Sequence, residues 1–540
     1  MNNSPSPRRI PVFIWVLIVL IIAVILAGLL LPSLAKSKAR AQRIGLHLSI
    51  QDDLEFVRSA SQPFNTEAYD HVSDNPFLSA RENPLSTFSI DVDTASYSNV
   101  RRFLQNHELP PKDAVRIEEL LNYFTYDYPA PKDDQPFAAH VEIAECPWNA
   151  AHRLARLGLK GKIIKAEQRP ACNLVFLIDV SGSMEPANKL PLLVRALELL
   201  VGELTEKDHV AIVVYAGNSG LVLDSTSGSD KRAILSALRR LTAGGSTNGG
   251  QGIELAYQTA VKTFIKGGAN RVILCTDGDF NVGISNAGEL TRLIKSKAAS
   301  GVFLTVLGFG MGNYKDSTLE KLADMGNGNY GYIDTLAEAK KMLVEQLNGT
   351  LITIAKDVKI QVEFNPSKVS AYRLIGYENR MLRKEDFNDD TKDAGELGSG
   401  HTVTALYEIV PAGSEIPTGS VDALKYQQPN TVLSTSPETM TVKLRYKLPE
   451  EDESKGMSVP VIDAGTPLLQ ASRDFKFAAG VAAFGMVLRQ SEHKGSSNFA
   501  LAEKLASEGN DGNQYRQEFL DLIRSAEQVY GVKTAMATRQ

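Results

Sequence analysis

The chain has 540 residues, of which 43% are hydrophobic and 22% are charged, and its formal net charge is −5. This length is too great for one hydrophobic core, so we expect about three domains. The acidic balance leaves no basic excess to neutralise phosphates, which argues against a nucleic-acid-binding protein. The three cysteines are too few for a disulfide framework. Cys275 is expected in a core strand, and spacing does not decide whether Cys146 and Cys172 pair.

Near its start the chain has an uncharged apolar run, residues 10–31, that is long enough to cross a bilayer. A cleaved signal peptide would have a shorter run and a small-residue cleavage site, so we expect an uncleaved, single-pass transmembrane anchor. Positive charges are more numerous after the run, which favours a cytoplasmic body. However, AGLLLPSLAKSKARAQRI resembles the anchor of bacterial pseudopilins, which implies an extracytoplasmic body, periplasmic or at the cell surface. The early Glu of the pseudopilin leader signature is absent, so neither processing nor pilus assembly is implied.

The segments after this run are predicted to be a stalk and a small α/β segment. Residues 35–82 are polar and helix-permissive, as expected of a stalk. In residues 83–136, a short strand is predicted at 88–90, and helices are predicted from Ser96 and over 115–124. Asp91 and Asp93 form a D-x-D pair of the kind that some phosphatases use with Mg²⁺. The next position that such enzymes need is Ala95, so we assign both carboxylates to a turn and a helix start.

The segment NLVFLIDVSGSM, residues 173–184, is the central feature of the chain. Its apolar run predicts a strand buried on both faces, and its polar residues begin at the carboxyl end, where open α/β sheets bind ligands. The carboxylate of Asp179 and the hydroxyls of Ser181 and Ser183 can turn toward one point. These oxygens suit a hard cation, Mg²⁺ first and Mn²⁺ or Ca²⁺ next. The alternative is structural, with Asp179 capping the next helix and both serines forming turns.

Two further loops complete this pattern. Thr247 lies in the loop GGSTNGG before a predicted helix at 253–265, and Asp277 follows a second buried strand, RVILCT. D-x-S-x-S followed by Thr and then Asp resembles the metal-ion-dependent adhesion site of the von Willebrand factor A domain, with every position filled. The resemblance implies that the ion binds an Asp or Glu of a partner protein. It also implies that the threonine joins the coordination when its loop and the last helix, here 335–347, shift. The expected metal ligands are Asp179, Ser181, Ser183, Thr247 and Asp277.

Strands and helices alternate from residue 170 to residue 350. This alternation predicts a doubly wound, mostly parallel sheet with right-handed crossovers, which is also the Rossmann-like fold that the von Willebrand A resemblance implies. The strands at 209–215 and 220–223 are joined by only a few residues, so they must be antiparallel at an edge of the sheet.

Strand-like segments occur on both sides of this α/β domain, and we expect them to form one β-rich module into which the domain is inserted. NPFLSARENPLSTFSIDVDTASYSNVRRFL, the YENR segment at 377–380 and the TVKLRY strand resemble a bacterial family of von Willebrand A proteins, the YfbK-like family, whose function is not described. The expected divisions are 1–34 transmembrane anchor, 35–82 stalk, 83–136 N-terminal α/β segment, 137–169 β segment, 170–350 von Willebrand A domain, 351–450 β-rich segment, and 451–540 linker and C-terminal helical segment.

These features predict a membrane-anchored, metal-dependent protein-binding module for adhesion or assembly, and not an enzyme. No catalytic residue is assigned. GGSTNGGQG lacks the G-K-[ST] of a phosphate-binding loop, Ser181 does not lie in a G-x-S-x-G elbow, and His209 is not assigned as a base. A Mg²⁺-dependent phosphohydrolase or nucleotide-binding enzyme, and a scaffold with an unused metal site, stay as alternatives. The sequence does not identify the partner or the oligomeric state.

Overall fold

A computed structural model describes residues 67, 69–90, 93–132, 134–245, 249–278, 287–298, 300–311, 315–392, 394–414 and 434–537. The expected anchor at 1–34, the expected stalk up to residue 66 and Thr247 lie outside these residues. Within the described part of the chain, no helix is both long enough and apolar enough to span a membrane.

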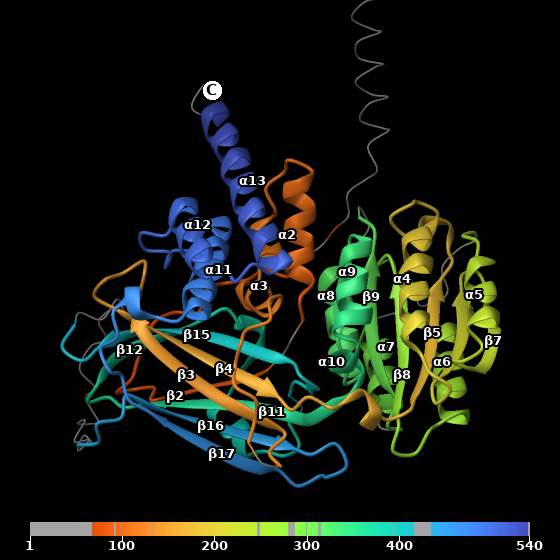
Figure 1. The fold of residues 1–540 in the computed structure, drawn as a ribbon, viewed down its shortest axis with the longest axis horizontal. Helices are drawn as coiled ribbons and strands as arrows, with labels where there is room; N and C mark the ends of the chain where they lie inside the picture. The colour runs from red at the N-terminus through yellow and green to blue at the C-terminus, as the bar shows by residue number, and fades with distance from the viewer. Residues whose placement is uncertain are drawn as a thin grey trace, which may run out of the picture. The chain divides into compact units, whose positions relative to one another are not determined.

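The α/β domain is built on a six-stranded sheet. In spatial order its strands are β10 (Tyr330–Ile333), β9 (Phe303–Phe309), β8 (Ala269–Thr276), β5 (Cys172–Asp179), β6 (His209–Tyr215) and β7 (Ser219–Ser227). Neighbours from β10 to β6 are parallel, whereas β7 is antiparallel to β6 because only residues 216–218 connect the two. The expected doubly wound α/β fold with an antiparallel edge pair is confirmed (Figure 1).

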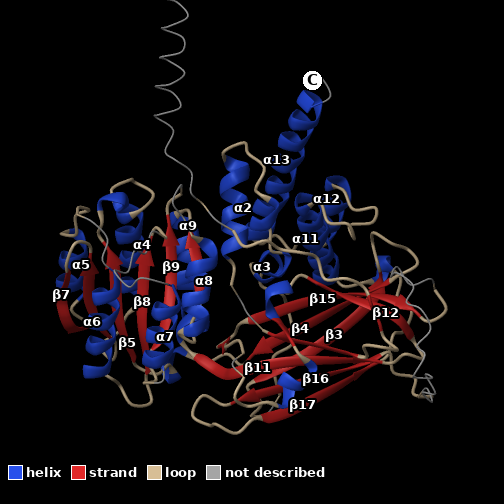
Figure 2. Cartoon of the chain, turned by 180° about the vertical axis from the view of Figure 1, so that it is seen from behind, coloured by secondary structure: helices blue, strands red, loops and turns tan. Residues whose placement is uncertain are grey.

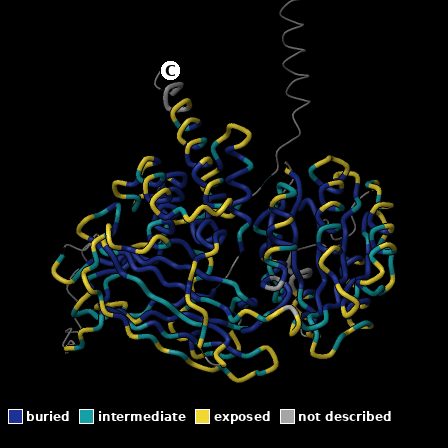
Figure 3. The backbone as a smooth tube through the Cα atoms, in the orientation of Figure 1, coloured by how far each residue is buried: buried dark blue, intermediate teal, exposed yellow. Residues whose placement is uncertain are grey.

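Helices cover both faces of this sheet. One face packs against α4 (Leu190–Glu203), α5 (Lys231–Arg239) and α9 (Leu336–Lys340), and the other against α6 (Gly249–Lys262), α7 (Ala287–Ala298) and α8 (Asp316–Met325). Alternate residues of the central strand point to opposite faces, so Phe176 and Ile178 join the first core while Val175 and Leu177 join the second. The whole of β5 is buried, as Figure 3 shows for the interior of the sheet.

The expected helix at 335–347 is interrupted. It begins with α9, whose N-cap Thr335 accepts a hydrogen bond from the backbone N–H of Glu338. The helix continues as one π-helical turn, Lys341–Glu345, and is followed by the short α10 (Leu347–Leu351). Such π turns occur often at functional positions, because they shift the register of the side chains that follow.

The β-rich module contains two sheets with a shared core. β4 precedes the α/β domain in the sequence and β15 follows it. The two strands pair from Lys160–Thr402 to Arg153–Ile409, so the α/β domain is inserted into one β-rich module (Figure 2). The first sheet is ordered β1 (Leu78–Ser79), β12 (Val369–Ile375), β15 (Thr402–Pro411), β4 (Arg153–Gly161), β3 (Phe137–Glu145). The second is ordered β13 (Met381–Leu382), β2 (Leu85–Ser89), β11 (Thr353–Phe364), β16 (Met440–Lys447), β17 (Lys455–Val461), with β14 (Leu397–Gly398) paired to β11.

The structure corrects the expected divisions in three places. β1, expected in the stalk, pairs with β12, and β2, expected in a separate N-terminal segment, pairs with β11. β17, expected in a linker, pairs with β16. Periodicity cannot assign such strands to a sheet, because their partners lie far away in the sequence. The three cysteines are free and buried, so Cys146 and Cys172 form no bridge.

A layer of helices covers the outer face of the first sheet. It combines α2 (Ala95–Gln105) and α3 (Ile117–Asn122) with α11 (Arg473–Arg489), α12 (Phe499–Glu508) and α13 (Gln514–Ala537). Leu154 and Leu406 of the sheet share a core with Phe124, Phe477 and Phe519 of these segments. The N-terminal and C-terminal segments therefore form one layer and not two separate units.

A buried arginine joins this helical layer to the α/β domain. Arg101 of α2 donates from Nε to Asp334 Oδ2 and from Nη2 to Glu338 Oε2, both at 2.8 Å. Arg101 and Glu338 are almost fully buried, and Tyr123 donates from its hydroxyl to the same Glu338 oxygen at 2.8 Å. The first turn of α9 is thus held by charges from the helical layer.

The YENR segment makes a second joint of this kind. Its Arg380 bonds to Asp93 Oδ2 at 3.2 Å and to Glu320 Oε1 and Asp324 Oδ2 on α8, each at 2.6 Å. Asp93 also accepts from the backbone N–H of Tyr330 at 2.9 Å. Asp93 therefore has a structural role, but its bonds connect β10 to the YENR segment, and the N-cap of α2 is Thr94 and not Asp93 as expected. Asp91 lies outside the described residues.

Candidate metal centre

The expected ligands lie at the carboxyl edge of the α/β sheet because β5 and β8 are parallel neighbours. Ile178 is paired with Cys275, so Asp179 at the end of β5 lies beside Thr276, the last residue of β8, which Asp277 follows. Both carboxylates are fully buried. The structure therefore brings Asp179 and Asp277 to one edge, although they are far apart in the sequence.

The carboxylate of Asp179 is held on both oxygens. Oδ1 accepts from the backbone N–H of Ser181 at 2.9 Å, and Oδ2 accepts from the hydroxyls of Tyr215 at 3.1 Å and Thr276 at 3.2 Å. Burial raises the pKa of Asp179 to about 6, hydrogen bonds from Ser181 and Tyr215 lower it, and the nearby Asp277 carboxylate raises it. The Ser181 bond is the local turn that the structural alternative expects, but Asp179 caps no helix.

Sequence analysis missed Tyr215 and Thr276. Each is the last residue of a strand next to β5, namely β6 and β8. A hydroxyl at the carboxyl end of a neighbouring parallel strand is the signal that could have found them, because such ends meet at one edge.

The two serine hydroxyls lie together above Asp179. Ser181 Oγ and Ser183 Oγ are 3.1 Å apart, and the Ser181 hydroxyl also bonds to the Asp179 carboxylate. Adjacent oxygens around an octahedral Mg²⁺ with bonds near 2.1 Å are about 3 Å apart. Ser181 is buried and Ser183 is exposed, so the site opens to solvent on the Ser183 side. The donor set and its spacing fit a hard divalent cation.

The start of the loop that carries Thr247 is hydrogen-bonded to the D-x-S-x-S loop. Gly244 donates its backbone N–H to Val180 O at 2.7 Å, and Gly182 donates to Gly245 O at 3.1 Å. Gly245 has a φ of +84°, a conformation that favours glycine. Thr247 itself lies outside the described residues.

A lysine that sequence analysis did not single out completes the site. Lys189 Nζ donates to Asp277 Oδ2 at 2.8 Å, and both side chains are buried. The lysine stem occupies the space beside Gly310, at the end of β9, where an added Cβ would lie 2.3 Å from Lys189 Cε. No spacing rule connects Lys189 to the metal-site pattern, so only the fold reveals this contact.

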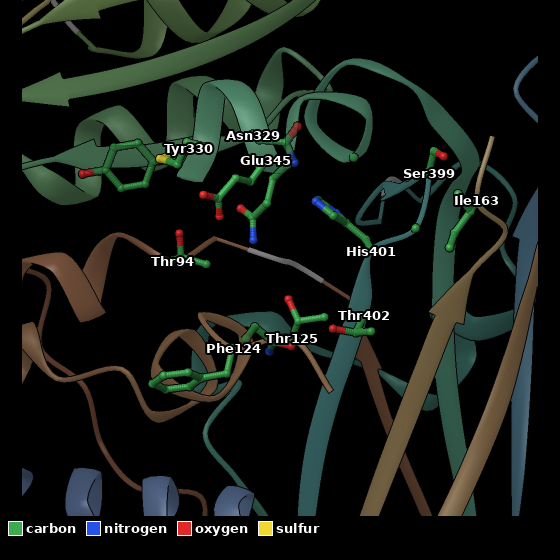
Figure 4. A pocket seen from close by; sticks show the side chains of 15 residues that line it. Thr94, Phe124, Thr125, Ile163, Asn329, Tyr330, Glu345, Ser399, His401 and Thr402 are labelled. Atoms are coloured by element: carbon green, nitrogen blue, oxygen red, sulfur yellow. The ribbon is translucent and has the colours of Figure 1, made fainter. Parts of the chain in front are cut away.

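Metal sites of the kind that use three acidic, histidine or cysteine side chains are absent from the described residues. The present site has two carboxylates and two hydroxyls among those residues. A separate cavity of about 290 Å³ contains His401, Glu345 and Thr94 in its lining (Figure 4). Burial lowers the pKa of His401 to about 4, so this histidine is uncharged at neutral pH. None of the four expected ligands that the structure describes lines that cavity.

The fold and this site define a protein with a von Willebrand factor type A domain. The family model for that domain matches residues 173–347, a von Willebrand factor model matches residues 63–156, and the model "Uncharacterized protein YfbK, C-terminal" matches residues 349–529. The chain is 46% identical over 476 residues to the uncharacterized protein YfbK of Escherichia coli K12, covering 86% of this chain and 82% of that protein. The chain therefore belongs to the YfbK family.

Two more distant similarities concern parts of the molecule. The 60 kDa subunit of magnesium chelatase from Rhodobacter capsulatus is 31% identical over 146 residues, which are 26% of each chain. The solved von Willebrand factor type A structure from Catenulispora acidiphila is 18% identical and covers 73% of this chain and 91% of that one, with a TM-score of 0.40.

Proposed function

We propose that this protein is a metal-dependent protein-binding module, in which Asp179, Ser181, Ser183, Thr247 and Asp277 hold a Mg²⁺ ion. The observation that carries the proposal is the pair of serine hydroxyls 3.1 Å apart beside the Asp179 carboxylate, at the sheet edge where Asp277 also lies. When bound, the ion would supply an electrophilic position for an Asp or Glu of a partner protein. Mn²⁺ or Ca²⁺ could take the same oxygens.

The protein's own residues prepare such a site. The hydroxyls of Tyr215 and Thr276 both donate to Oδ2 of Asp179 and hold the carboxylate in one orientation, so its remaining lone pairs have a fixed direction. Backbone hydrogen bonds between the first and second loops hold the start of the Thr247 loop beside the serines. Neutral hydroxyls as the other donors leave the ion more positive than additional carboxylates would, which favours an acidic ligand.

Binding is favoured over catalysis by what surrounds these ligands. Asp179 accepts hydrogen bonds from the hydroxyls of Tyr215 and Thr276, and Asp277 accepts one from the ammonium group of Lys189. The D-x-D pair that would suit a phosphatase contributes Asp93 to a joint between segments. Release of phosphate from nucleotides or phosphoesters by the purified protein, dependent on Mg²⁺, would support the enzyme alternative instead.

We also propose that residues 1–34 anchor the protein in a membrane as a single pass, with the body in the periplasm or at the cell surface. The uncharged run at 10–31 and the resemblance to pseudopilin anchors support this arrangement. Protease treatment of intact cells and of spheroplasts tests it. A body that is protected in spheroplasts and digested only after lysis would place it in the cytoplasm.

The metal site is tested by titrating Mg²⁺ into the purified protein in a calorimeter. Asp179→Asn should abolish binding because it removes a coordinating charge without changing the apolar faces of the sheet. Thr247→Ala should weaken the binding, because it removes one of the proposed coordinating hydroxyls. Asp224→Asn, on the exposed edge strand β7, is the matched control and should bind as the wild type does. Unchanged binding in the Asp179 variant would contradict the proposed site.

Partner binding is tested by elution. Proteins retained on the immobilised wild type in Mg²⁺ should elute with EDTA and should be absent from an Asp179→Asn column. A partner that stays bound in excess EDTA would show that its binding does not depend on the metal ion.

A further inference from the structure

The contact between Lys189 and Asp277 places a third charge in the metal centre. The ammonium nitrogen lies 2.8 Å from Asp277 Oδ2, close enough for a charge-assisted hydrogen bond. Both side chains are buried, so water screens the pair little. The charge of Lys189 therefore belongs to the site and not to the surrounding surface.

The position of Lys189 is fixed by the fold. The residue immediately precedes α4, the helix that follows the D-x-S-x-S loop, and its backbone N–H donates to Pro186 O at 2.9 Å. Its methylenes pass beside Gly310 at the carboxyl end of β9, where only glycine leaves the necessary room. Three elements thus hold the ammonium group at Asp277: the loop before α4, the end of β8 and the end of β9.

The charges of the described groups can be added. Asp179 and Asp277 contribute two negative charges, which a divalent ion would balance to zero. Lys189 makes the site one unit more positive, with or without the ion, than these two carboxylates alone would. A more positive buried centre binds a cation more weakly and an anionic ligand more strongly.

We propose that Lys189 sets the ligand preference of this centre: it neutralises Asp277, weakens the binding of the bare cation and strengthens the binding of a carboxylate to the loaded site. This inference rests on the proposed metal-dependent function. It assigns to Lys189 a positioning and specificity role, since the ammonium group holds Asp277 and does not itself coordinate the ion. An acidic side chain of a partner is then favoured over a neutral amide or hydroxyl.

The test uses the full-length protein with Lys189→Met, which keeps most of the apolar stem and removes the charge. Mg²⁺ binding is measured by calorimetry. Carboxylate binding is measured with acetate on the Mn²⁺-loaded protein, through the fall in water proton relaxation as acetate displaces bound water. We expect Mg²⁺ to bind at least tenfold more tightly and acetate at least tenfold more weakly than in the wild type.

Two further variants separate charge from structure. Lys189→Gln can still hydrogen-bond to Asp277 but carries no charge, so it should shift both affinities as Lys189→Met does. Lys207→Met removes an exposed lysine next to Asp208, before β6 and at the opposite end of the strands, and should change neither.

The opposite directions of the two shifts distinguish this role from a structural one. If both neutral variants lose Mg²⁺ and acetate binding together, or fail to fold, Lys189 only supports the site and the inference is wrong. Unchanged affinities in folded variants overturn it as well, while leaving the proposed function intact. A wild type that binds no Mg²⁺ removes the proposed function, and the inference with it.

Discussion

Replacing Arg101 tests whether the helical layer holds the last helix of the α/β domain through charge. Arg101→Met removes a guanidinium that contacts Asp334 and Glu338, whose side chains are 5% and 0% exposed. Burial already raises the pKa of Asp334, and Arg101 lowers it, so the variant should leave this group even more costly to ionise.

The magnitude follows from the burial of the partners. Removing one member of a buried ion pair typically costs about 3–5 kcal/mol, because the other charge stays buried without compensation. The third partner, Glu518, is 38% exposed and should add less than about 1 kcal/mol. Glu338 keeps its bond from Tyr123, which limits the loss. We therefore expect Arg101→Met to lower the free energy of unfolding by about 3–5 kcal/mol.

The assay is urea unfolding followed by circular dichroism. Arg239→Met is the matched control, since Arg239 pairs with Glu198 on the exposed surface and its loss should cost at most about 1 kcal/mol. Adding Glu338→Gln to Arg101→Met should restore part of the stability by removing the uncompensated charge. If Arg101→Met costs no more than Arg239→Met, the buried charges do not hold the helix and the reasoning fails.

Two further predictions concern Lys341 in the π-helical turn and Gly328 just before β10. Burial lowers the pKa of Lys341 to about 7, against about 10.4 in an unfolded chain. Between these values the unfolded chain binds the proton and the folded chain does not, so the free energy of unfolding should rise with pH. The expected rise is about 2 kcal/mol from pH 7.5 to pH 9. Lys341→Met should lose that rise in urea midpoints measured at both pH values; an identical pH dependence would refute the assignment. Gly328→Ala should destabilise the protein by more than about 2 kcal/mol, because its Cβ would lie 1.7 Å from the carbonyl oxygen of Leu304. A thermal melt like that of the wild type would contradict it.

The sequence predicted the α/β domain well because its signals are local. The apolar run of β5 and the polar residues that follow it indicate both a buried strand and the edge where ligands bind. The short connection after Tyr215 was enough to predict an antiparallel edge strand. The four described candidate ligands could be predicted for the same reason, since each follows directly from the end of a strand or lies in the adjoining loop.

The features that the sequence did not predict depend on contacts between distant segments. β2 was predicted as a strand, but its pairing with β11 could not be read from either segment. Asp93 was assigned a turn or helix-start role, and its bond to Arg380 became visible only when the YENR segment was placed beside it. The helical periodicity of 474–488 gave no sign that α11 is buried on every side between segments from both ends of the chain.

The amino-acid sequence alone determined that a buried parallel strand ends in a cluster of oxygen donors, because strand periodicity and turn chemistry operate within a few residues. The tertiary structure alone decided that Lys189 reaches Asp277 and that charges of the helical layer hold α9. Those contacts arise where separate strand ends and helices converge, and electrostatic interactions depend on distance in space and not on separation along the chain.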